Sequence, residues 1–244
     1  MAALTASKLL NVWERGFSQM PAEQALTLLH ASVPELSFDA IASLPVGERD
    51  ASLLRLREAL WGPQMVAVAP CPRCSEGLDL TLSTEEILLG ASGPREAEYA
   101  LSVDGFFVRF RPPTGEDLIS LTPADSPEAA AAKILQQCLI SAHRGAKSIG
   151  VSDFPPSLVD AIDRMMAESD PLAEIRLNLS CPACGHCWFA PLDIVSFLWS
   201  ELDAWARRTL RDVHTLARAY GWREQDILAL SSTRRHFYLG LVNA

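Results

Sequence analysis

The 244-residue sequence has no long hydrophobic run, and no stretch approaches the about 20 consecutive apolar residues that a membrane-spanning helix needs. Its first residues, MAALTASKLLNVWERGF, also lack the apolar core of a secretory signal, because Asn11, Glu14 and Arg15 interrupt it. We therefore expect a soluble protein that stays in the cytoplasm, where it is made. Any later export would be as part of an assembly.

Positive charge is scarce as well. Lys and Arg number 21 against 30 Asp and Glu, which gives a formal net charge of −9 at pH 7. A whole-chain nucleic-acid binder needs a cationic face to displace phosphate counterions, so we expect no nucleic acid as partner. No His–Asp–Ser or paired-carboxylate arrangement has a spacing that demands catalysis, and His30, His143, His214 and His236 stand isolated. We therefore expect no enzymatic activity.

The overall composition is that of an ordinary globular protein, with 49% hydrophobic and 21% charged residues. At roughly 100–200 residues per domain, the length corresponds to one large domain or two small ones. Such a chain can bury a sizeable core without disulfides. Disordered, collagen-like and small disulfide-rich classes are thereby excluded.

The six cysteines are the most informative residues. Four of them form two CPxC pairs, Cys71 with Cys74 and Cys181 with Cys184. In a reducing cytosol such pairs indicate a metal site before they indicate disulfides. Four thiolates complete a tetrahedral Zn²⁺ shell with Zn–S bonds of about 2.3 Å, which leaves no position for water. The spacing therefore predicts one structural zinc ion rather than a catalytic one.

Other interpretations of the cysteines remain open at this point. A rubredoxin-like iron site would use the same four ligands. Two separate metal sites would form if His186 or Cys187 joined the second pair. Thioredoxin-type redox chemistry is disfavoured, because neither CPxC lies at the strand-to-helix junction of a βαβ unit. We expect Cys187 to be a buried or half-buried thiol, and Cys138 to be a small core residue in a helix.

Each CPxC pair lies between two strand-like arms, and each is followed by a helix-like segment; at least two of the four arms alternate in hydrophobicity. This weak internal repeat predicts that the two knuckles pack as one zinc ribbon, split by an inserted subdomain. The fold class expected is α+β and predominantly helical. The predicted divisions are an N-terminal helical segment 1–63, the split ribbon 64–90 and 172–192, an inserted α/β subdomain 91–171, and a C-terminal helical segment 193–244.

Amphipathic periodicity and capping residues predict most of the remaining elements. Helices are expected at 6–17, 21–31, 47–60, 127–142, 156–168, 193–220, 223–230 and 233–241, with a short apolar turn at 38–44. Asp104-Gly105 lies between two alternating runs, which is the strongest short-range signal for a hairpin. Gly62 and Pro63 are expected to end the helix before the first knuckle.

The C-terminal sequence, FLWSELDAWARRTLRDVHTLARAYGWREQDILALSSTRRHFYLGLV, resembles baseplate- and hub-associated proteins of contractile phage tails and phage-tail-like contractile injection systems. These are distantly related to the baseplate hub subunit of T-even phages. The segments LPVGERDASLLRLREALWGPQM and FRPPTGEDL resemble the same family, and Tyr220–Leu228 is the most specific stretch. The resemblance implies a non-enzymatic role in baseplate or hub assembly, as subunit or chaperone. It also implies baseplate or hub partners, and incorporation into an assembled tail-like particle.

The segment from Glu201 to His236 carries seven arginines and five acidic residues. Arginines and aromatic residues are enriched in interfaces, so this helical surface is a candidate for docking onto an acidic protein surface. An ordinary solvated helix face is the alternative. The candidate partner-binding residues are Trp205, Arg207, Arg208, Arg211, Arg218, Trp222 and Arg223. The alternative function is a zinc-ribbon nucleic-acid-binding regulator, which the net charge disfavours.

Overall fold

The computed structural model describes residues 4–89 and 96–242. It is a mixed α+β structure, 55% helical, with small sheets, which confirms the expected predominantly helical class. The chain forms two compact units, one from Met1–Leu36 with Val195–Ala244 and one from Ser37–Ile194. The divisions drawn from the sequence after residues 63, 90, 171 and 192 stay predictions. None of the described helices is long and apolar enough to cross a membrane.

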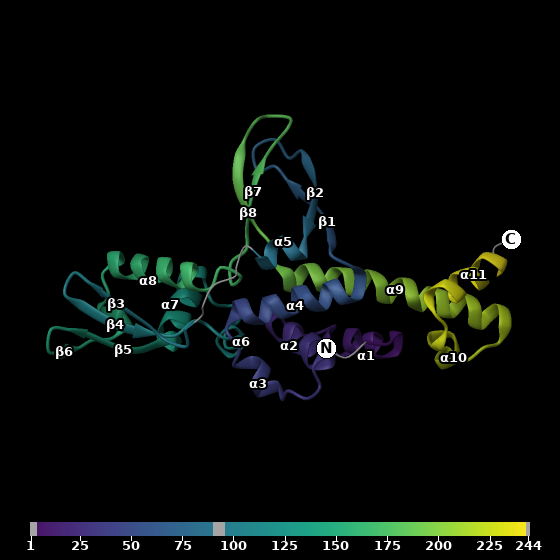
Figure 1. The fold of residues 1–244 in the computed structure, drawn as a ribbon, viewed down its shortest axis with the longest axis horizontal. Coiled ribbons are helices and arrows are strands. Elements are labelled where there is room, and N and C mark those ends of the chain that lie inside the picture. Colours follow the sequence, from purple (N-terminus) through teal and green to yellow (C-terminus); the bar gives the residue numbers. More distant parts are fainter. Residues whose placement is uncertain (1–3, 90–95, 243–244) are drawn as a thin grey trace. The chain divides into compact units, whose positions relative to one another are not determined.

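The first unit is helical (Figure 1). Its elements are α1 (Ala6–Gly16), α2 (Pro21–Ser32), α9 (Ile194–Tyr220), α10 (Glu224–Ala229) and α11 (Ser232–Val242). All five begin and end within about two residues of the predicted bounds, because capping residues and proline mark the termini locally. The hydroxyl of Thr5, for example, accepts a hydrogen bond from the Lys8 N–H at the start of α1.

Specific contacts hold these helices together. The indole N–H of Trp13 in α1 donates to the carboxylate of Asp203 in α9 at 2.8 Å. The ring of Trp199 lies so close to Gly16 that a Cβ there would come within 2.3 Å of it. Near the end of α9, a small core joins α9, α10 and α11 around Leu216 and Ile227, which are both fully buried.

The second unit includes the helices α3 (Phe38–Ala42), α4 (Val46–Trp61), α5 (Thr84–Leu89) and α6 (Gly115–Ile119), besides the two that pack on its largest sheet. Gly62 ends α4 with a φ of 88°, as its sequence position predicted. The turn expected at 38–44 is wrong in detail. Residues Phe38–Ala42 form a short helix because the Ser37 hydroxyl accepts a hydrogen bond from the Ala40 N–H and caps it.

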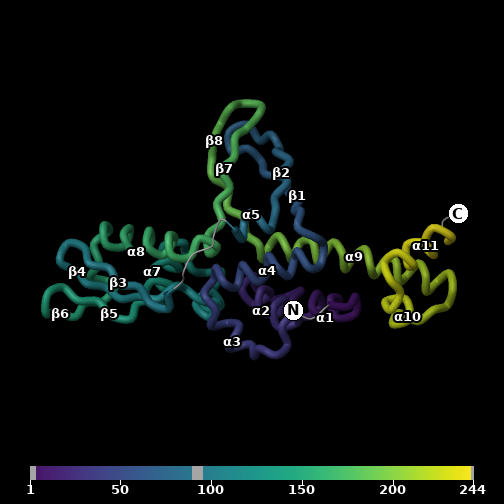
Figure 2. Tube along the Cα trace, viewed as in Figure 1, coloured from purple at the N-terminus to yellow at the C-terminus, as the bar shows by residue number. Residues whose placement is uncertain are grey.

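The inserted region is a four-stranded antiparallel sheet with helices on one face. Its elements are β3 (Tyr99–Val103), β4 (Phe106–Phe110), α7 (Pro127–Cys138), β5 (Leu139–Arg144), β6 (Lys147–Ser148), the 3-10 turn η1 (Val151–Asp153) and α8 (Pro156–Ser169). The predicted hairpin is confirmed, with Asp104 and Gly105 both at positive φ. Buried β4 residues pack against Leu135 of α7 and Leu158 of α8. Figure 2 traces this region between β2 and β7 in chain order.

The helix predicted over 127–142 is four residues too long. It ends at Cys138, and Leu139 begins β5, which pairs antiparallel with β4. Leu139 and Ile140 are apolar and fit either structure, so local sequence does not decide between them. The pairing with β4 favours the strand, because the backbone N–H and C=O groups after Cys138 form hydrogen bonds with β4. Cys138 is fully buried, as expected of a small core residue.

A bidentate ion pair anchors α6. The Arg111 guanidinium donates to both carboxylate oxygens of Asp117, at 2.6 and 2.8 Å, and the Thr114 N–H donates to the same carboxylate at 2.7 Å. Burial alone would raise the pKa of the Asp117 carboxyl, but these hydrogen bonds outweigh it and hold the pKa below its ordinary value. Thr114 and Asp117 thus form a capping box at the start of α6.

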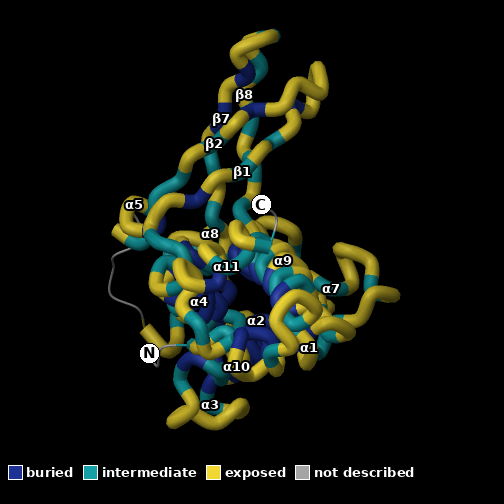
Figure 3. The backbone as a smooth tube through the Cα atoms, turned by 90° about the vertical axis from the view of Figure 1, so that its right-hand side faces the viewer, coloured by how far each residue is buried: buried dark blue, intermediate teal, exposed yellow. Residues whose placement is uncertain are grey.

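Two β-hairpins complete the second unit. β1 (Gln64–Pro70) pairs with β2 (Gly77–Ser83), and β7 (Arg176–Ser180) pairs with β8 (Cys187–Pro191). We call these the thiol hairpins, because each CPxC lies at the turn of one. They lie side by side in Figures 1 and 3. Figure 3 shows that most of their length is exposed and that only a few positions are buried.

Candidate metal centre

The two CPxC turns have the same backbone structure. In the first, the Cys71 N–H donates to the Glu76 carbonyl at 2.8 Å and the Ser75 N–H donates to the Cys71 carbonyl at 2.9 Å. In the second, Cys181, Gly185 and His186 repeat both bonds, each at 2.9 Å. Ser75 and Gly185 occupy equivalent positions and both have positive φ, 62° and 68°. The weak internal repeat seen in the sequence is therefore a repeat of structure.

The turns bring the four thiols together. Cys71 Sγ lies 3.8 Å from Cys184 Sγ, and Cys74 Sγ lies 3.6 Å from Cys181 Sγ. All four sulfurs lie within 4.8 Å of one another. The convergence predicted from spacing alone is thus confirmed, although the two pairs are more than 100 residues apart in sequence.

These distances fit a single ion. Four sulfurs at about 2.3 Å from a tetrahedral centre are separated by about 3.8 Å edge to edge. The separations of 3.6 and 3.8 Å match that value, so the sulfurs can hold a thiophilic metal ion with little rearrangement. Four thiolates also fill the shell, which suits a structural site and leaves no position for a substrate or water.

Hydrogen bonds favour one thiolate in this cluster and disfavour a second. Burial alone would raise the pKa of the Cys71 thiol, but N–H groups of Arg73 and Cys74 and the neighbouring thiols lower the pKa to about 7. At Cys74 the Glu76 N–H lowers the pKa, but hydrogen bonds with the other three cysteines and burial outweigh it and raise the pKa to about 12. The cluster thus takes one negative charge readily and resists further ones, a repulsion that a bound cation would relieve.

A small hydrophobic cluster packs against the two CPxC turns. Cys71 and Cys181 are buried against Leu78, and Trp188 packs at the edge of the same cluster. The ring of His186 stacks on that of Trp188, with 6.0 Å between centroids and 8° between planes. Rigid support of this kind fixes the direction of the sulfurs.

The other cysteines lie apart from the cluster. Among the described residues, the group able to hold a metal contains neither His186 nor Cys187. The expectation that Cys187 is buried is wrong. Its side chain is exposed at the start of β8, where Sγ lies 3.6 Å from the Ser180 hydroxyl on the paired strand. Period-2 alternation places Trp188 toward the core and therefore Cys187 toward solvent. Burial in the sheet core raises the pKa of the Cys138 thiol to about 12, which makes it unreactive.

The candidate docking residues lie on the C-terminal helices of the first unit. Arg207, Arg208, Arg211, Arg218 and Arg223 are exposed, and Trp205 and Trp222 are half-buried. Arg207 is paired with Asp203 at 2.8 Å, one turn earlier in α9. The ring of Trp222 stacks on that of Tyr220, with 4.7 Å between centroids, and contacts that of Tyr238 edge to face at 5.0 Å. Trp222 therefore contributes to packing within the first unit.

The sequence did not predict a cavity beside α11. Arg235 in α11 is buried, and it lines a cavity together with Trp205, Arg208 and Arg211. The Arg234-Arg235 pair was visible in the sequence, but the period of a short helix does not reveal which of two adjacent arginines faces inward.

Comparisons with known proteins identify the family. Residues 8–199 match the family model described as T4 bacteriophage base plate protein. No curated protein and no solved structure matched the chain. The matched range includes both CPxC turns but ends before Tyr220–Leu228, so that stretch contributes nothing to the match. Because the match covers well over half of the 244 residues, the chain belongs to the T4 bacteriophage base plate protein family.

Proposed function

We propose that this chain is a non-enzymatic structural or assembly protein of the baseplate of a contractile tail-like particle. The observation that carries the proposal is the family match over residues 8–199. It supports a structural baseplate role, baseplate partners and a place in the particle or in its assembly. The closed four-thiol cluster agrees with a scaffold, because it offers no open coordination position for catalysis.

We further propose that Cys71, Cys74, Cys181 and Cys184 bind one structural Zn²⁺ and that the thiol hairpins form a zinc ribbon around it. Support comes from the sulfur separations of 3.6 and 3.8 Å and from the equivalent turns. Iron would use the same four sulfurs, and metal analysis distinguishes the two.

The proposed role of the ion is to clamp two distant parts of the chain. Cys74 and Cys181 are 107 positions apart, so the ion closes a loop that contains the whole inserted sheet. A structural zinc contributes about 10–16 kcal/mol of apparent binding free energy in small zinc domains, and that free energy becomes folding free energy. The clamp would therefore fix both ends of the inserted region within the second unit.

We also propose that the exposed arginines of α9 and the following turn dock onto baseplate partners. Arg208, Arg211, Arg218 and Arg223 form no ion pair within 4.0 Å in the part of the chain that the structure describes. They are therefore available to acidic groups of another protein.

Gene deletion with complementation tests the proposed function. Cells that lack this chain should form no complete contractile particles by electron microscopy, and the intact gene should restore them. Cys74→Ser should fail to restore particles, whereas Cys187→Ser, which changes an exposed thiol outside the cluster, should restore them. Normal particles from the deletion strain would refute the baseplate role.

A further inference from the structure

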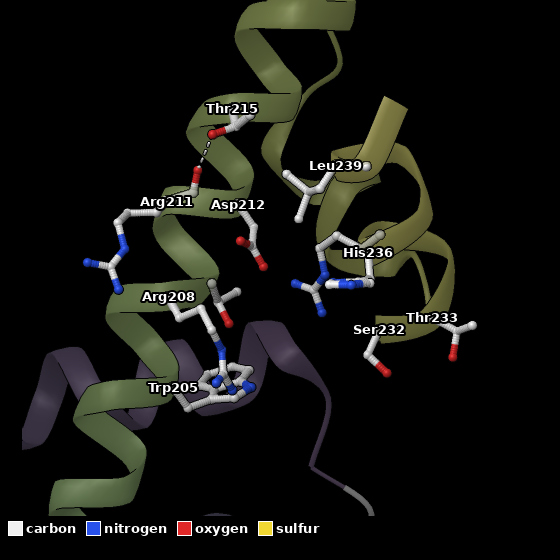
Figure 4. A pocket seen from close by; sticks show the side chains of 12 residues that line it. Trp205, Arg208, Arg211, Asp212, Thr215, Ser232, Thr233, His236 and Leu239 are labelled. Atoms are coloured by element: carbon white, nitrogen blue, oxygen red, sulfur yellow. Dashed lines mark hydrogen bonds between the residues drawn. The ribbon is translucent and has the colours of Figure 1, made fainter. Parts of the chain in front are cut away.

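A cavity of about 790 Å³ lies between α9 and α11, both within the first compact unit (Figure 4). Arg208, Arg211 and Asp212 of α9 line one side, and Arg235, His236 and Leu239 of α11 line the other. The volume is in the range of pockets that hold ligands. The family match ends at residue 199, so the cavity lies in a part of the chain that the match does not describe.

Arg235 is the unusual residue of this cavity. It is only 7% exposed, and its Nη1 atom has no hydrogen-bond partner among the described residues. A guanidinium does not lose its charge at physiological pH, so deprotonation cannot remove the free-energy cost of burying that charge. A buried cationic donor without an acceptor is costly, which points to an acceptor supplied from outside.

The walls add to this positive charge. Three arginines and one aspartate line the cavity, which leaves a net charge of +2 with His236 neutral. Within the described residues, none of the three arginines forms an ion pair within 4.0 Å with Asp212 or with any other acid. The excess positive charge is therefore not neutralised inside the unit, and it favours an anionic occupant.

The shape indicates a short chain segment. Arg208 and Thr215 both line the cavity, and seven residues of helix extend about 10 Å. An extended peptide covers that length with about three residues. Figure 4 shows Trp205 at one end and Leu239 at the other, with Asp212 and His236 between them. A lining that combines apolar side chains with guanidinium groups suits a peptide that carries acidic side chains next to an apolar one.

We propose that this cavity binds a carboxylate-bearing segment of a partner protein, with Arg235 as the buried anchor and Arg208 and Arg211 as flanking contacts. The inference rests on the proposed function, since it specifies how the C-terminal helices would meet a baseplate partner. An acidic peptide is favoured over nucleic acid because the cavity is only about 10 Å long and offers Trp205 and Leu239 as apolar contacts, whereas a nucleic acid needs a longer cationic groove that follows its backbone.

Peptide titration of the full-length, metal-loaded protein tests the proposal. The probe is a fluorescein-labelled hexapeptide of glutamates with one central leucine, and the matched probe has glutamine in place of glutamate. Fluorescence anisotropy should show binding of the glutamate peptide only. Replacing Arg208 and Arg211 together by alanine should weaken binding by about tenfold or more, because charge-assisted hydrogen bonds are lost. Arg234→Ala in α11 is the matched control, because Arg234 is exposed and does not line the cavity, and it should change affinity less than twofold.

Arg235→Gln tests the anchor, but a buried substitution can also disturb folding. An NMR readout on the unaltered protein therefore accompanies it. The indole N–H resonance of Trp205, which lines the cavity, should shift on addition of the glutamate peptide, whereas that of Trp188 in the thiol hairpins should not. Equal binding of the glutamine peptide, or equal weakening by Arg234→Ala and the double variant, would overturn the proposal. Tighter binding of a single-stranded oligonucleotide of equal charge, lost in the same double variant, would also overturn it.

Particle assembly separates this inference from the proposed function. If the deletion strain lacks particles and the Arg208→Glu, Arg211→Glu variant restores them fully, the cavity proposal fails and the baseplate role stands. If the peptide binds as expected but the deletion strain assembles normally, the baseplate role fails and the cavity remains a peptide site.

Discussion

Gly47→Ala should strongly destabilise the second unit. Gly47 lies in the first turn of α4, where Pro45 provides no side-chain cap. Its N–H instead donates to a carboxylate oxygen of buried Asp170 at 2.8 Å, from 123 positions away in the sequence. Asp170 thus acts as a long-range N-cap and places a negative charge at the positive end of the helix.

The loss of stability expected for Gly47→Ala follows from the position of the Asp170 carboxylate. A Cβ on residue 47 would lie 1.9 Å from Asp170 Oδ1, so the carboxylate must retreat by about 1.5 Å to reach the 3.4 Å of an ordinary contact. Such a shift breaks the hydrogen bond, which costs about 1.5–3 kcal/mol for a charged acceptor. Overpacking lowers the free energy of unfolding by a further amount of about 1–3 kcal/mol, and the higher helix propensity of alanine offsets up to about 1 kcal/mol of this loss. The net expectation is a loss of about 2–5 kcal/mol.

Hydrogen exchange read by mass spectrometry on peptides that cover α4 is the assay, because it reports on this unit separately. Protection should fall by at least about tenfold, since about 1.4 kcal/mol corresponds to a factor of ten. Gly150→Ala is the control, because a Cβ there meets only Ser152 Oγ at an ordinary 3.9 Å. In an Asp170→Ala background the Gly47→Ala cost should largely disappear. An equal cost in both backgrounds would show that the clash with Asp170 is not the cause of the destabilisation.

Three further predictions concern the second unit. Arg111→Met should lower stability at pH 7 by about 1–2 kcal/mol, a value reduced for the partial exposure of the guanidinium. The folded-state pKa of Asp117 is depressed, so the stability difference between the two proteins is present above pH 3.8, the ordinary pKa, and should shrink as the pH falls through the folded-state pKa. Urea titrations at several pH values measure this difference. A difference that stays constant with pH would contradict the prediction. Ser75→Gly should stabilise the metal-free protein by about 0.5–1 kcal/mol in thermal melts, because it relieves a positive φ that Gly185 already accommodates in the other turn, whereas a loss would argue against strain there. Cys74→Ser should lower the metal content per chain and expose the thiol hairpins to proteolysis, whereas Cys187→Ser should leave both unchanged; equal effects of the two substitutions would mean that the cluster is wrongly assigned.

The sequence predicted local features well. Capping residues and prolines placed most helix ends, and Asp104-Gly105 placed the β3–β4 hairpin. The convergence of the CPxC pairs was also predictable, because two equivalent knuckles have few other ways to complete one tetrahedral shell.

What the sequence did not reveal depends on contacts between distant residues. Leu139 begins a strand only because β4 is there to pair with it. The link from Gly47 to Asp170 joins positions that no periodicity connects. Arg235 could be distinguished from its neighbour only once α11 was packed against α9. These features arise from tertiary packing, which overrides or supplements local preference.

X-ray absorption at the zinc edge, on the protein purified from its producing cells, tests whether the four cysteines bind one zinc ion. We expect one zinc ion per chain with a single shell of four sulfurs at about 2.3 Å. A shell with nitrogen or oxygen ligands, or two zinc ions per chain, would contradict the single four-thiolate clamp.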